Sequence, residues 1–243
     1  MGKVKIKRKS TLIDMTAMSD VTVLLLTFFM LTSTFLQKEP VTVITPSSVS
    51  EIKVPTANVA QVLVAPQGKV FLSLLGDADP DRAEEWGSEA LRKEVLKTAA
   101  ANYEAYTGKK TGLTPLDLEK FAKNASFGVP MSKMHEFLML DQGKQDEWLG
   151  DMTRKDVGIP FDDIRYTDQN GNQLTTNEFQ IWMRAIYNSS NSNIHDAIQK
   201  GEGIAVKSDR GTKFETIHKV LDNLQTIKMN KFSVMTALKT EAD

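Results

Sequence analysis

The sequence has no cysteine, which excludes disulfide bonds and thiolate metal sites. An excess of charge of one sign is also lacking, because 30 Lys and Arg residues nearly balance 31 Asp and Glu residues. With 25% charged residues and a mean hydropathy of −0.28, the composition argues against a transporter with many membrane spans. It fits a soluble body of about 200 residues on a single span, large enough for one substantial core or two small ones.

Catalytic motifs are lacking as well. The chain contains no serine nucleophile elbow, no phosphate-binding loop and no paired carboxylates at a catalytic spacing. His135, His195 and His218 are scattered without the spacing of metal ligands. We therefore expect no enzymatic activity, no cofactor and no metal.

One long hydrophobic run is present near the N-terminus. From Met15 to Leu36, about 22 helical residues would cover about 33 Å, against a hydrocarbon core of about 30 Å. We therefore predict a transmembrane helix over residues 13–37. One carboxylate, Asp20, lies inside this run, where an acid costs up to about 2.5–3.5 kcal/mol on insertion scales. Such a residue usually marks an ion or proton pathway, so we predict that Asp20 carries protons.

Three threonines share the side of the predicted helix that carries this acid. At about 100° per residue, Thr16, Thr27 and Thr34 all fall within about 40° of Asp20. In lipid a polar stripe of this kind must face protein or water, so the helix is expected to have partners. We predict that the three threonines support the proton path, although threonines in membrane helices often only bond the carbonyl one turn back.

Two simpler interpretations of the run stay open. It could be a cleaved secretory signal, but it is too long and no small-x-small cleavage site follows it. It could also be a plain anchor whose Asp20 reaches the cytoplasmic headgroups.

The sequences on either side of the run indicate its orientation. Residues 1–12 form a basic tail with five Lys and Arg residues, so the positive-inside rule places them in the cytoplasm and the rest of the chain on the far side. A nucleic-acid role for this tail is a weaker explanation, because the span follows at once. Residues 38–58 contain Pro46 and Pro55 and no helical period, which predicts an extended linker, parts of which could add to a sheet edge.

Residues 59–243 are predicted to form an α+β domain, a small sheet with helices on one face, interrupted by a mainly helical insertion at about residues 77–160. Two β-rich runs flanking Pro66-Gln67-Gly68 predict a hairpin. In the insertion, one helix is expected to open at Asp79 and run toward Tyr106, and another to be capped by Thr114. Further along, we predict strands at residues 162–166, 203–207 and 232–238, a helix at 175–188, and a helix at 212–227 with Phe214, Ile217, Val220, Leu221 and Leu224 facing inward.

The block Ile13-Asp-Met-Thr-Ala-Met-Ser-Asp20 ahead of the apolar run resembles the N-terminal signature of the ExbD/TolR family, roughly I-N-x-T-P-x-x-D. The segments Val43-Ile-Thr-Pro-Ser-Ser and Gly68-Lys-Val-Phe-Leu are similar to the parts that follow in that family, and so is the stretch from Ile204 to Thr236. The resemblance extends over about residues 3–75 and 160–240 and is closer to ExbD than to TolR. Ala17 and Asp14 depart from the signature, and the insertion has no counterpart in the usual short domain.

The resemblance implies an inner-membrane protein with a periplasmic domain. ExbD-like proteins form a homodimer whose helices lie inside a pentameric ring of ExbB-like helices. Proton flow past the single aspartate, here Asp20, moves the dimer, and a TonB-like protein receives the work and opens outer-membrane transporters. Protons are then the coupling ion. Two alternatives are a TolR-like motor for envelope maintenance and a membrane-anchored module that binds peptidoglycan or protein.

Overall fold

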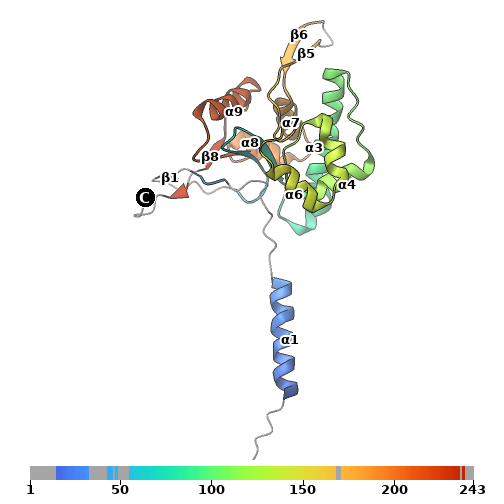
Figure 1. The fold of residues 1–243 in the computed structure, drawn as a ribbon, viewed down its shortest axis with the longest axis vertical. Helices are drawn as coiled ribbons and strands as arrows, with labels where there is room; N and C mark the ends of the chain where they lie inside the picture. Colours follow the sequence, from blue (N-terminus) through green and yellow to red (C-terminus); the bar gives the residue numbers. More distant parts are fainter. Residues whose placement is uncertain are drawn as a thin grey trace, which may run out of the picture. The chain divides into compact units, whose positions relative to one another are not determined.

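The computed structural model describes residues 15–32, 43–45, 47–48, 55–167, 171–235 and 237–238. The chain divides into two compact units, Met1–Gln37 and Lys38–Asp243. The first unit contains α1 (Met15–Thr32), and the second contains the other elements described (Figure 1). A helix is therefore present within the predicted span, and the remainder of that span, residues 13–14 and 33–37, lies outside the described residues.

The second unit is organised around a five-stranded sheet of order β4-β3-β2-β7-β8. Its strands are β2 (Val59–Val64), β3 (Val70–Leu75), β4 (Ser126–Phe127), β7 (Ile204–Ser208) and β8 (Ser233–Met235). β2 and β3 form the predicted antiparallel hairpin, and β2, β7 and β8 pair in parallel. The prediction of an α+β body with a small sheet is thus confirmed.

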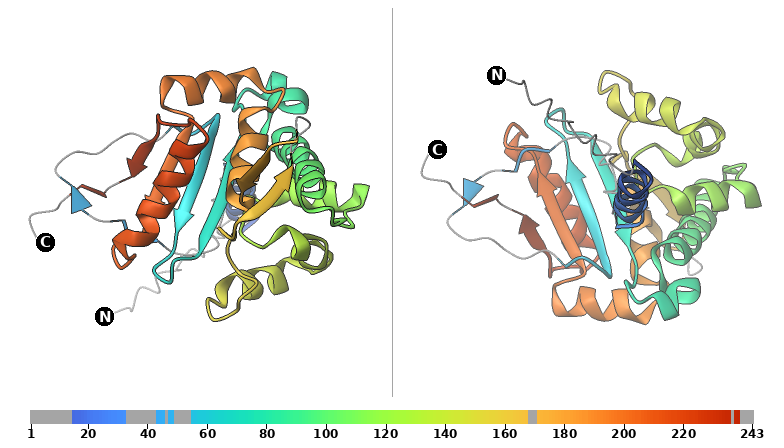
Figure 2. Two further views of the ribbon diagram at one scale, coloured as in Figure 1. Left: turned by 90° about the horizontal axis from the view of Figure 1, so that it is seen from above. Right: turned by 90° about the horizontal axis from the view of Figure 1, so that it is seen from below.

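The core lies between the sheet and its helices. Val62 lies opposite Leu72 on one neighbouring strand and Val206 on the other, and all three side chains are fully buried. Figure 2 shows α7 (Glu178–Tyr187) and α9 (Phe214–Thr226) against the same face of the sheet. In this core the Trp182 ring of α7 lies 4.6 Å from the Phe127 ring, centroid to centroid.

Residues 77–160 are mainly helical, as predicted. The elements are η1 (Pro80–Arg82), α2 (Ala83–Trp86), α3 (Ser88–Thr107), α4 (Pro115–Lys123), η2 (Met131–Lys133), α5 (Met134–Met139) and α6 (Gln142–Gly150). The expected helix from Asp79 to Tyr106 is broken at Gly87, whose ψ of 171° is extended. The chain leaving β3 passes so close that a Cβ on Gly76 would lie 2.5 Å from the Gly87 carbonyl carbon. This close approach accounts for the break.

The C-terminal part differs from prediction in three places. β5 (Ile164–Thr167) pairs with β6 (Gln173–Thr176), so the helix expected from Thr175 begins only at Glu178, after the N-cap Asn177. α8 (Ser192–Lys200) was not predicted. Phe214 was predicted to face inward but is 75% exposed. It is the first residue of α9, and the buried residues of this helix, Val220 and Leu224, come later in it.

The last strand pairs with the predicted linker. β9 (Ala237–Leu238) lies parallel to β1 (Ser47–Ser48). Val43 is 7% exposed, and its neighbour Ile44 bonds to Asp209 and Arg210 in the loop after β7. Residues 38–42, 46 and 49–54 of the linker lie outside the described residues.

Candidate functional site

α1 is formed by a run without glycine or proline between Met15 and Thr32. Its threonines bond back to carbonyls of the same helix: the hydroxyls of Thr22, Thr27 and Thr32 donate to the carbonyl oxygens of Ser19 (2.8 Å), Leu24 (2.9 Å) and Phe28 (2.8 Å). The hydroxyl hydrogens are thus bonded within the helix, which lets these residues occupy an apolar helix at little cost.

Asp20 is the only charged residue of α1. It is exposed, and Thr16, one turn earlier on the same face, is exposed as well. Thr27 lies further along this face, with its hydroxyl hydrogen bonded to the Leu24 carbonyl. Thr34, the fourth residue of the predicted stripe, lies outside the described residues. Thr16, Asp20 and Thr27 therefore follow one side of α1.

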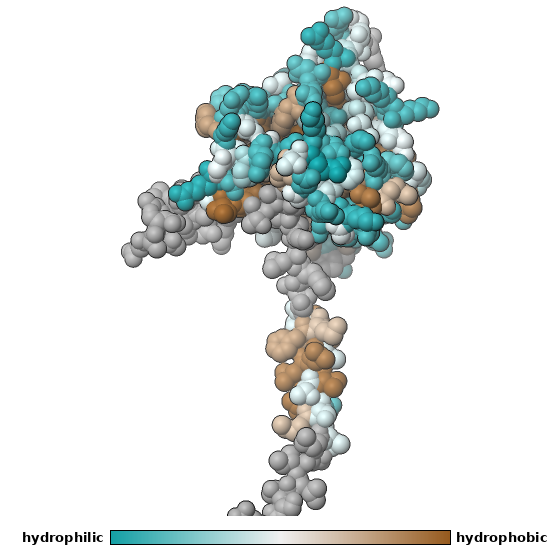
Figure 3. Space-filling model, viewed as in Figure 1, coloured by the Kyte–Doolittle hydropathy of each residue, from teal (hydrophilic) through white to brown (hydrophobic). Residues whose placement is uncertain are grey.

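The rest of the α1 surface is apolar. Ten large side chains between Met18 and Leu31 are 50–87% exposed and point to all sides of the helix, and apolar residues cover most of its visible surface in Figure 3. A helix that is hydrophobic all round is normally buried in a protein core or in a membrane. Among the residues that the structure describes, no helix has both the length and the hydropathy needed to cross a bilayer.

The histidines of the second unit have local roles. His135 Nδ1 lies 2.8 Å from Asp117 Oδ2, and His218 Nδ1 lies 2.7 Å from Asp222 Oδ2. The His195 ring packs 4.5 Å from the ring of Tyr187. In the part of the chain that the structure describes, no group of three His, Asp or Glu side chains is arranged to hold a metal ion.

Three buried charged groups of the second unit were missed by the sequence reasoning. Arg92 is 3% exposed and donates to the carbonyl oxygens of Leu74 and Ala122. Asp117 is fully buried, and Glu178 is 8% exposed. Only Asp117 had a usable signal, because it is the third residue after Thr114 in a capping box.

The comparisons with known proteins identify the N-terminal half. The model of a family described as biopolymer transport protein ExbD/TolR matches residues 7–123. No curated protein and no solved structure matches the chain. The matched range includes α1 with Asp20, the β2–β3 hairpin and the helices through α4. It therefore enters the segment we expected to lack a counterpart, and the resemblance at residues 160–240 stays a prediction.

The order of elements agrees with this match. An apolar helix that carries one acid stands first, followed by a linker and an α+β body built on a hairpin. Through residues 7–123, this chain belongs to the ExbD/TolR family of biopolymer transport proteins.

Proposed function

We propose that this chain is the inner-membrane subunit of a motor of the ExbB/ExbD type that uses the proton-motive force to energise TonB-dependent transport at the outer membrane. One observation carries the proposal: the family match includes all of α1, whose apolar surface holds a single carboxylate, Asp20. In this proposal residues 13–37 cross the membrane, residues 1–12 lie in the cytoplasm and residues 38–243 lie in the periplasm.

Asp20 is proposed as the proton carrier because its two protonation states need different surroundings. A protonated carboxyl can rest against apolar helices, whereas a carboxylate needs water or a donor such as the Thr16 hydroxyl. Alternation between these states couples proton passage to the position of the helix. Each proton that moves through 100 mV supplies about 2.3 kcal/mol. This is close to the cost of about 2.5–3.5 kcal/mol for an acid in a membrane helix.

The threonines support the path to different degrees. Thr16 lies one turn from Asp20, so its hydroxyl can reach the carboxylate. Thr27 and Thr34 lie seven and fourteen residues beyond Asp20, about 10 Å and 20 Å along a helix, so their hydroxyls cannot reach its carboxylate directly. We therefore propose that Thr16 and Asp20 act together and that Thr27 and Thr34 contribute less.

The proposed partners enclose α1 and receive its motion. Ten exposed apolar side chains and one acid require a surrounding of lipid and protein, which a pentameric ring of ExbB-like helices around a homodimer of this chain would provide. A TonB-like protein is the proposed recipient in the periplasm, and protons are the coupling ion. Peptidoglycan is a further candidate ligand of the periplasmic body.

A TolR-like motor for envelope maintenance is the second candidate, because the matching family model covers both ExbD and TolR. Deletion of the gene separates the two. Loss of TonB-dependent uptake with an intact outer membrane supports the first function, whereas normal uptake with an outer membrane that leaks periplasmic proteins supports the second.

The experiment that tests the proton role compares Asp20→Asn with Asp14→Asn in the host bacterium. Asp14 is the other acid of the family-like block and is predicted to lie at the cytoplasmic interface, so it is a matched control. We expect Asp20→Asn to co-purify with its multi-span partner as the wild type does but to lose iron-chelate uptake, and Asp14→Asn to retain uptake. Uptake by Asp20→Asn at the wild-type rate would contradict the proposal.

A further inference from the structure

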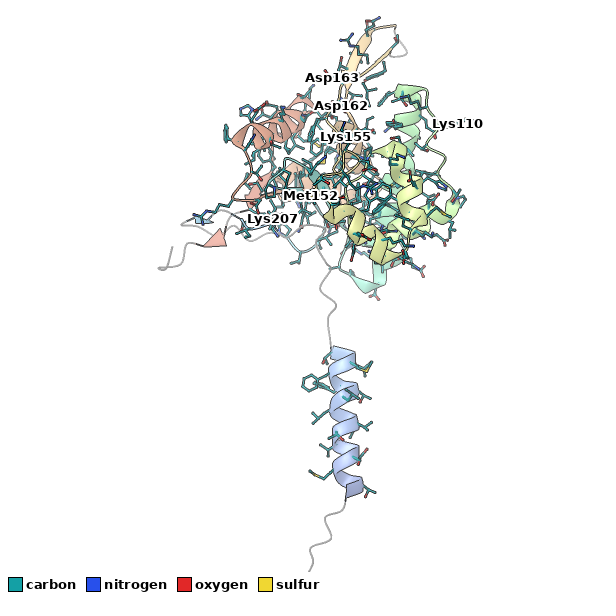
Figure 4. The ribbon with its side chains drawn as sticks, in the orientation of Figure 1. Lys110, Met152, Lys155, Asp162, Asp163 and Lys207 are labelled. Carbon is teal, nitrogen blue, oxygen red and sulfur yellow. The ribbon has the colours of Figure 1, made fainter. Side chains whose placement is uncertain are left out.

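The α3 helix and the residues before it carry opposite charges at their two ends. Residues 77–89 contain six acids, which are Asp77, Asp79, Asp81, Glu84, Glu85 and Glu89, and one base, Arg82. Toward the other end the exposed charged residues are Lys93, Lys97, Lys109 and Lys110, and Figure 4 shows Lys110 in the loop after α3. Two copies placed antiparallel would therefore bring opposite charges together.

The acids at the basic end are engaged within the chain. Glu94 accepts hydrogen bonds from the backbone N–H and hydroxyl of Ser190, at 2.6 and 2.8 Å. Glu104 accepts two 2.7 Å hydrogen bonds from Thr111, which fix the loop between α3 and α4. Both carboxylates keep their negative charge, but the four exposed lysines outnumber them and leave residues 93–110 with a net charge of +2.

A hollow of about 310 Å³ lies between α3 and α4 at this basic end. Most of its exposed lining is apolar, and the full lining is Lys97, Ala100, Ala101, Glu104, Thr111, Leu113, Thr114, Pro115 and Leu118. Of its two charged residues, Glu104 bonds to Thr111, and Lys97 is exposed. Because the Glu104–Thr111 bonds fix the loop that forms one wall, the hollow exists before anything binds. The hollow can therefore accept a large apolar side chain of a partner, and Lys97 at its rim can pair with a carboxylate next to that side chain.

The acidic end offers such a side chain. α2 buries none of its residues, and its last residue, Trp86, is only partly buried. The Trp86 indole N–H donates a 3.2 Å hydrogen bond to Glu85, so the ring is held beside an acid. Tryptophan at a surface is a frequent anchor of protein interfaces.

We propose that the occupant of the hollow is a second copy of this chain, with the two α3 helices packed antiparallel about a twofold axis near Lys93. Within α3, Lys93 lies four residues from both Glu89 and Lys97. The twofold axis therefore brings Glu89 to the partner's Lys97, and the acidic end that carries Trp86 to the basic end of the partner, where the hollow lies. The same patch serves both copies, as an isologous interface requires.

The size of this contact makes it dependent on tethering. A 20-residue helix is about 30 Å long, so a face about 10 Å wide buries about 300 Å² per copy, below the about 800 Å² of a stable interface. The contact therefore forms only where another part of the assembly already holds the two copies together. The homodimer of the proposed function would do this, so in this respect the inference rests on the proposed function.

The test is disulfide cross-linking of the full chain in its native membrane with its ring partner present. The chain has no cysteine, so Lys93→Cys introduces a single thiol at the proposed axis, and Lys219→Cys places one at an exposed site on α9 as a control. We expect mild oxidation to cross-link Lys93→Cys at least about fivefold more than Lys219→Cys, because a disulfide needs Cα atoms within about 7 Å. Equal cross-linking, or none at Lys93→Cys, would overturn the proposal.

Charge reversal identifies the occupant. In the Lys93→Cys background, Glu89→Lys and Lys97→Glu should each lower cross-linking about threefold or more, because each places like charges opposite one another. The double variant should restore it. If the double variant stays as low as the single ones, the occupant is another protein or a lipid surface, and the proposal is wrong. Glu89, Lys93 and Lys97 are all exposed, so these changes should leave stability within about 0.5 kcal/mol.

The two proposals fail separately. No cross-link at Lys93→Cys, together with loss of uptake in Asp20→Asn, would refute the proposed α3 contact and support the proposed motor function. A cross-link that forms and is restored by charge exchange, together with normal uptake in Asp20→Asn, would support the α3 contact and refute the proposed motor function.

Discussion

The backbone N–H of Met131 donates a 2.8 Å hydrogen bond to Oε2 of Glu178, which joins η2 to the first turn of α7. Burial raises the pKa of Glu178 to about 7; the Met131 bond opposes this shift, and the charge of Asp162 adds to it. In the unfolded chain the same carboxyl titrates near its ordinary value of 4.5. Between these two values the folded protein holds a proton that the unfolded chain has released.

This difference predicts that stability falls as the pH rises. Because the pKa of Glu178 is higher in the folded state, this shift adds to the free energy of unfolding. The added stability is fully present below pH 4.5 and is lost as the pH rises through about 7. The loss by pH 8 should be about 3 kcal/mol. Glu178→Gln resembles the protonated form and keeps an acceptor for Met131, so it should flatten this dependence and be the more stable protein at pH 8.

Urea unfolding between pH 5 and pH 8, followed by tryptophan fluorescence, measures the effect. All three tryptophans lie in Lys38–Asp243, so the signal reports this unit. Glu147→Gln, at an exposed site on α6, is the control and should keep the wild-type slope. An unchanged slope in Glu178→Gln would show that this carboxyl does not hold the proton.

The Asp117–His135 pair predicts a second effect, with the opposite dependence on pH. Burial by itself would raise the pKa of Asp117, but hydrogen bonds from Thr114 and His135 hold it below its ordinary value. The pair therefore stabilises the fold at pH values above 3.8, the pKa of Asp117 in the unfolded chain. This stabilisation is lost as the pH falls below 3.8 and passes through the lower pKa that Asp117 has in the folded protein. At neutral pH, His135→Ala leaves a buried carboxylate with one donor fewer and should cost about 1–3 kcal/mol.

The matched control is His218→Ala, which removes a histidine from an exposed pair of similar geometry, with Asp222. Exposed pairs contribute about 0–1 kcal/mol, so this variant should unfold at nearly the wild-type urea concentration. Equal losses in the two variants would mean that burial of Asp117 does not set the cost.

Arg92 predicts a third effect, on the junction between β3 and the helices α3 and α4. Its guanidinium donates to Leu74 O through Nε (3.0 Å) and Nη2 (2.8 Å), and to Ala122 O through Nη1 (2.9 Å). Arg92→Met leaves two buried carbonyl groups without these donors and should cost about 2–4 kcal/mol. Lys93→Met, at the exposed neighbouring position, should cost under about 0.5 kcal/mol in the same urea titration. A loss in Arg92→Met no larger than that would contradict a structural role.

Local signals in the sequence predicted the elements whose ends are set by neighbouring residues. Thr114 caps α4 by accepting from the Asp117 N–H, and Asp117 accepts from the Thr114 N–H in return, as a capping box requires. The β2–β3 hairpin was equally predictable, because Gly68, with φ of +78°, permits the turn between two β-rich runs.

Features set by distant parts of the chain could not be predicted in this way. The break at Gly87 occurs where the backbone of Gly76 passes close to it, and the buried Glu178 accepts a hydrogen bond from Met131, 47 residues away in the chain. The exposure of Phe214 depends on where α9 begins relative to the sheet. The candidate site could be predicted, because an acid within an apolar run is visible in the sequence itself. The structure adds that this run forms a helix, α1, which carries Asp20.

Proton flux through reconstituted vesicles tests the role of Asp20 most directly. Vesicles that contain the full chain and its ring partner should take up protons under an imposed membrane potential, as reported by a pH-sensitive dye inside them. With Asp20→Asn the rate should fall to that of vesicles without protein, while Asp14→Asn should keep the wild-type rate. Wild-type flux through Asp20→Asn would contradict the proposal that this carboxyl carries the proton.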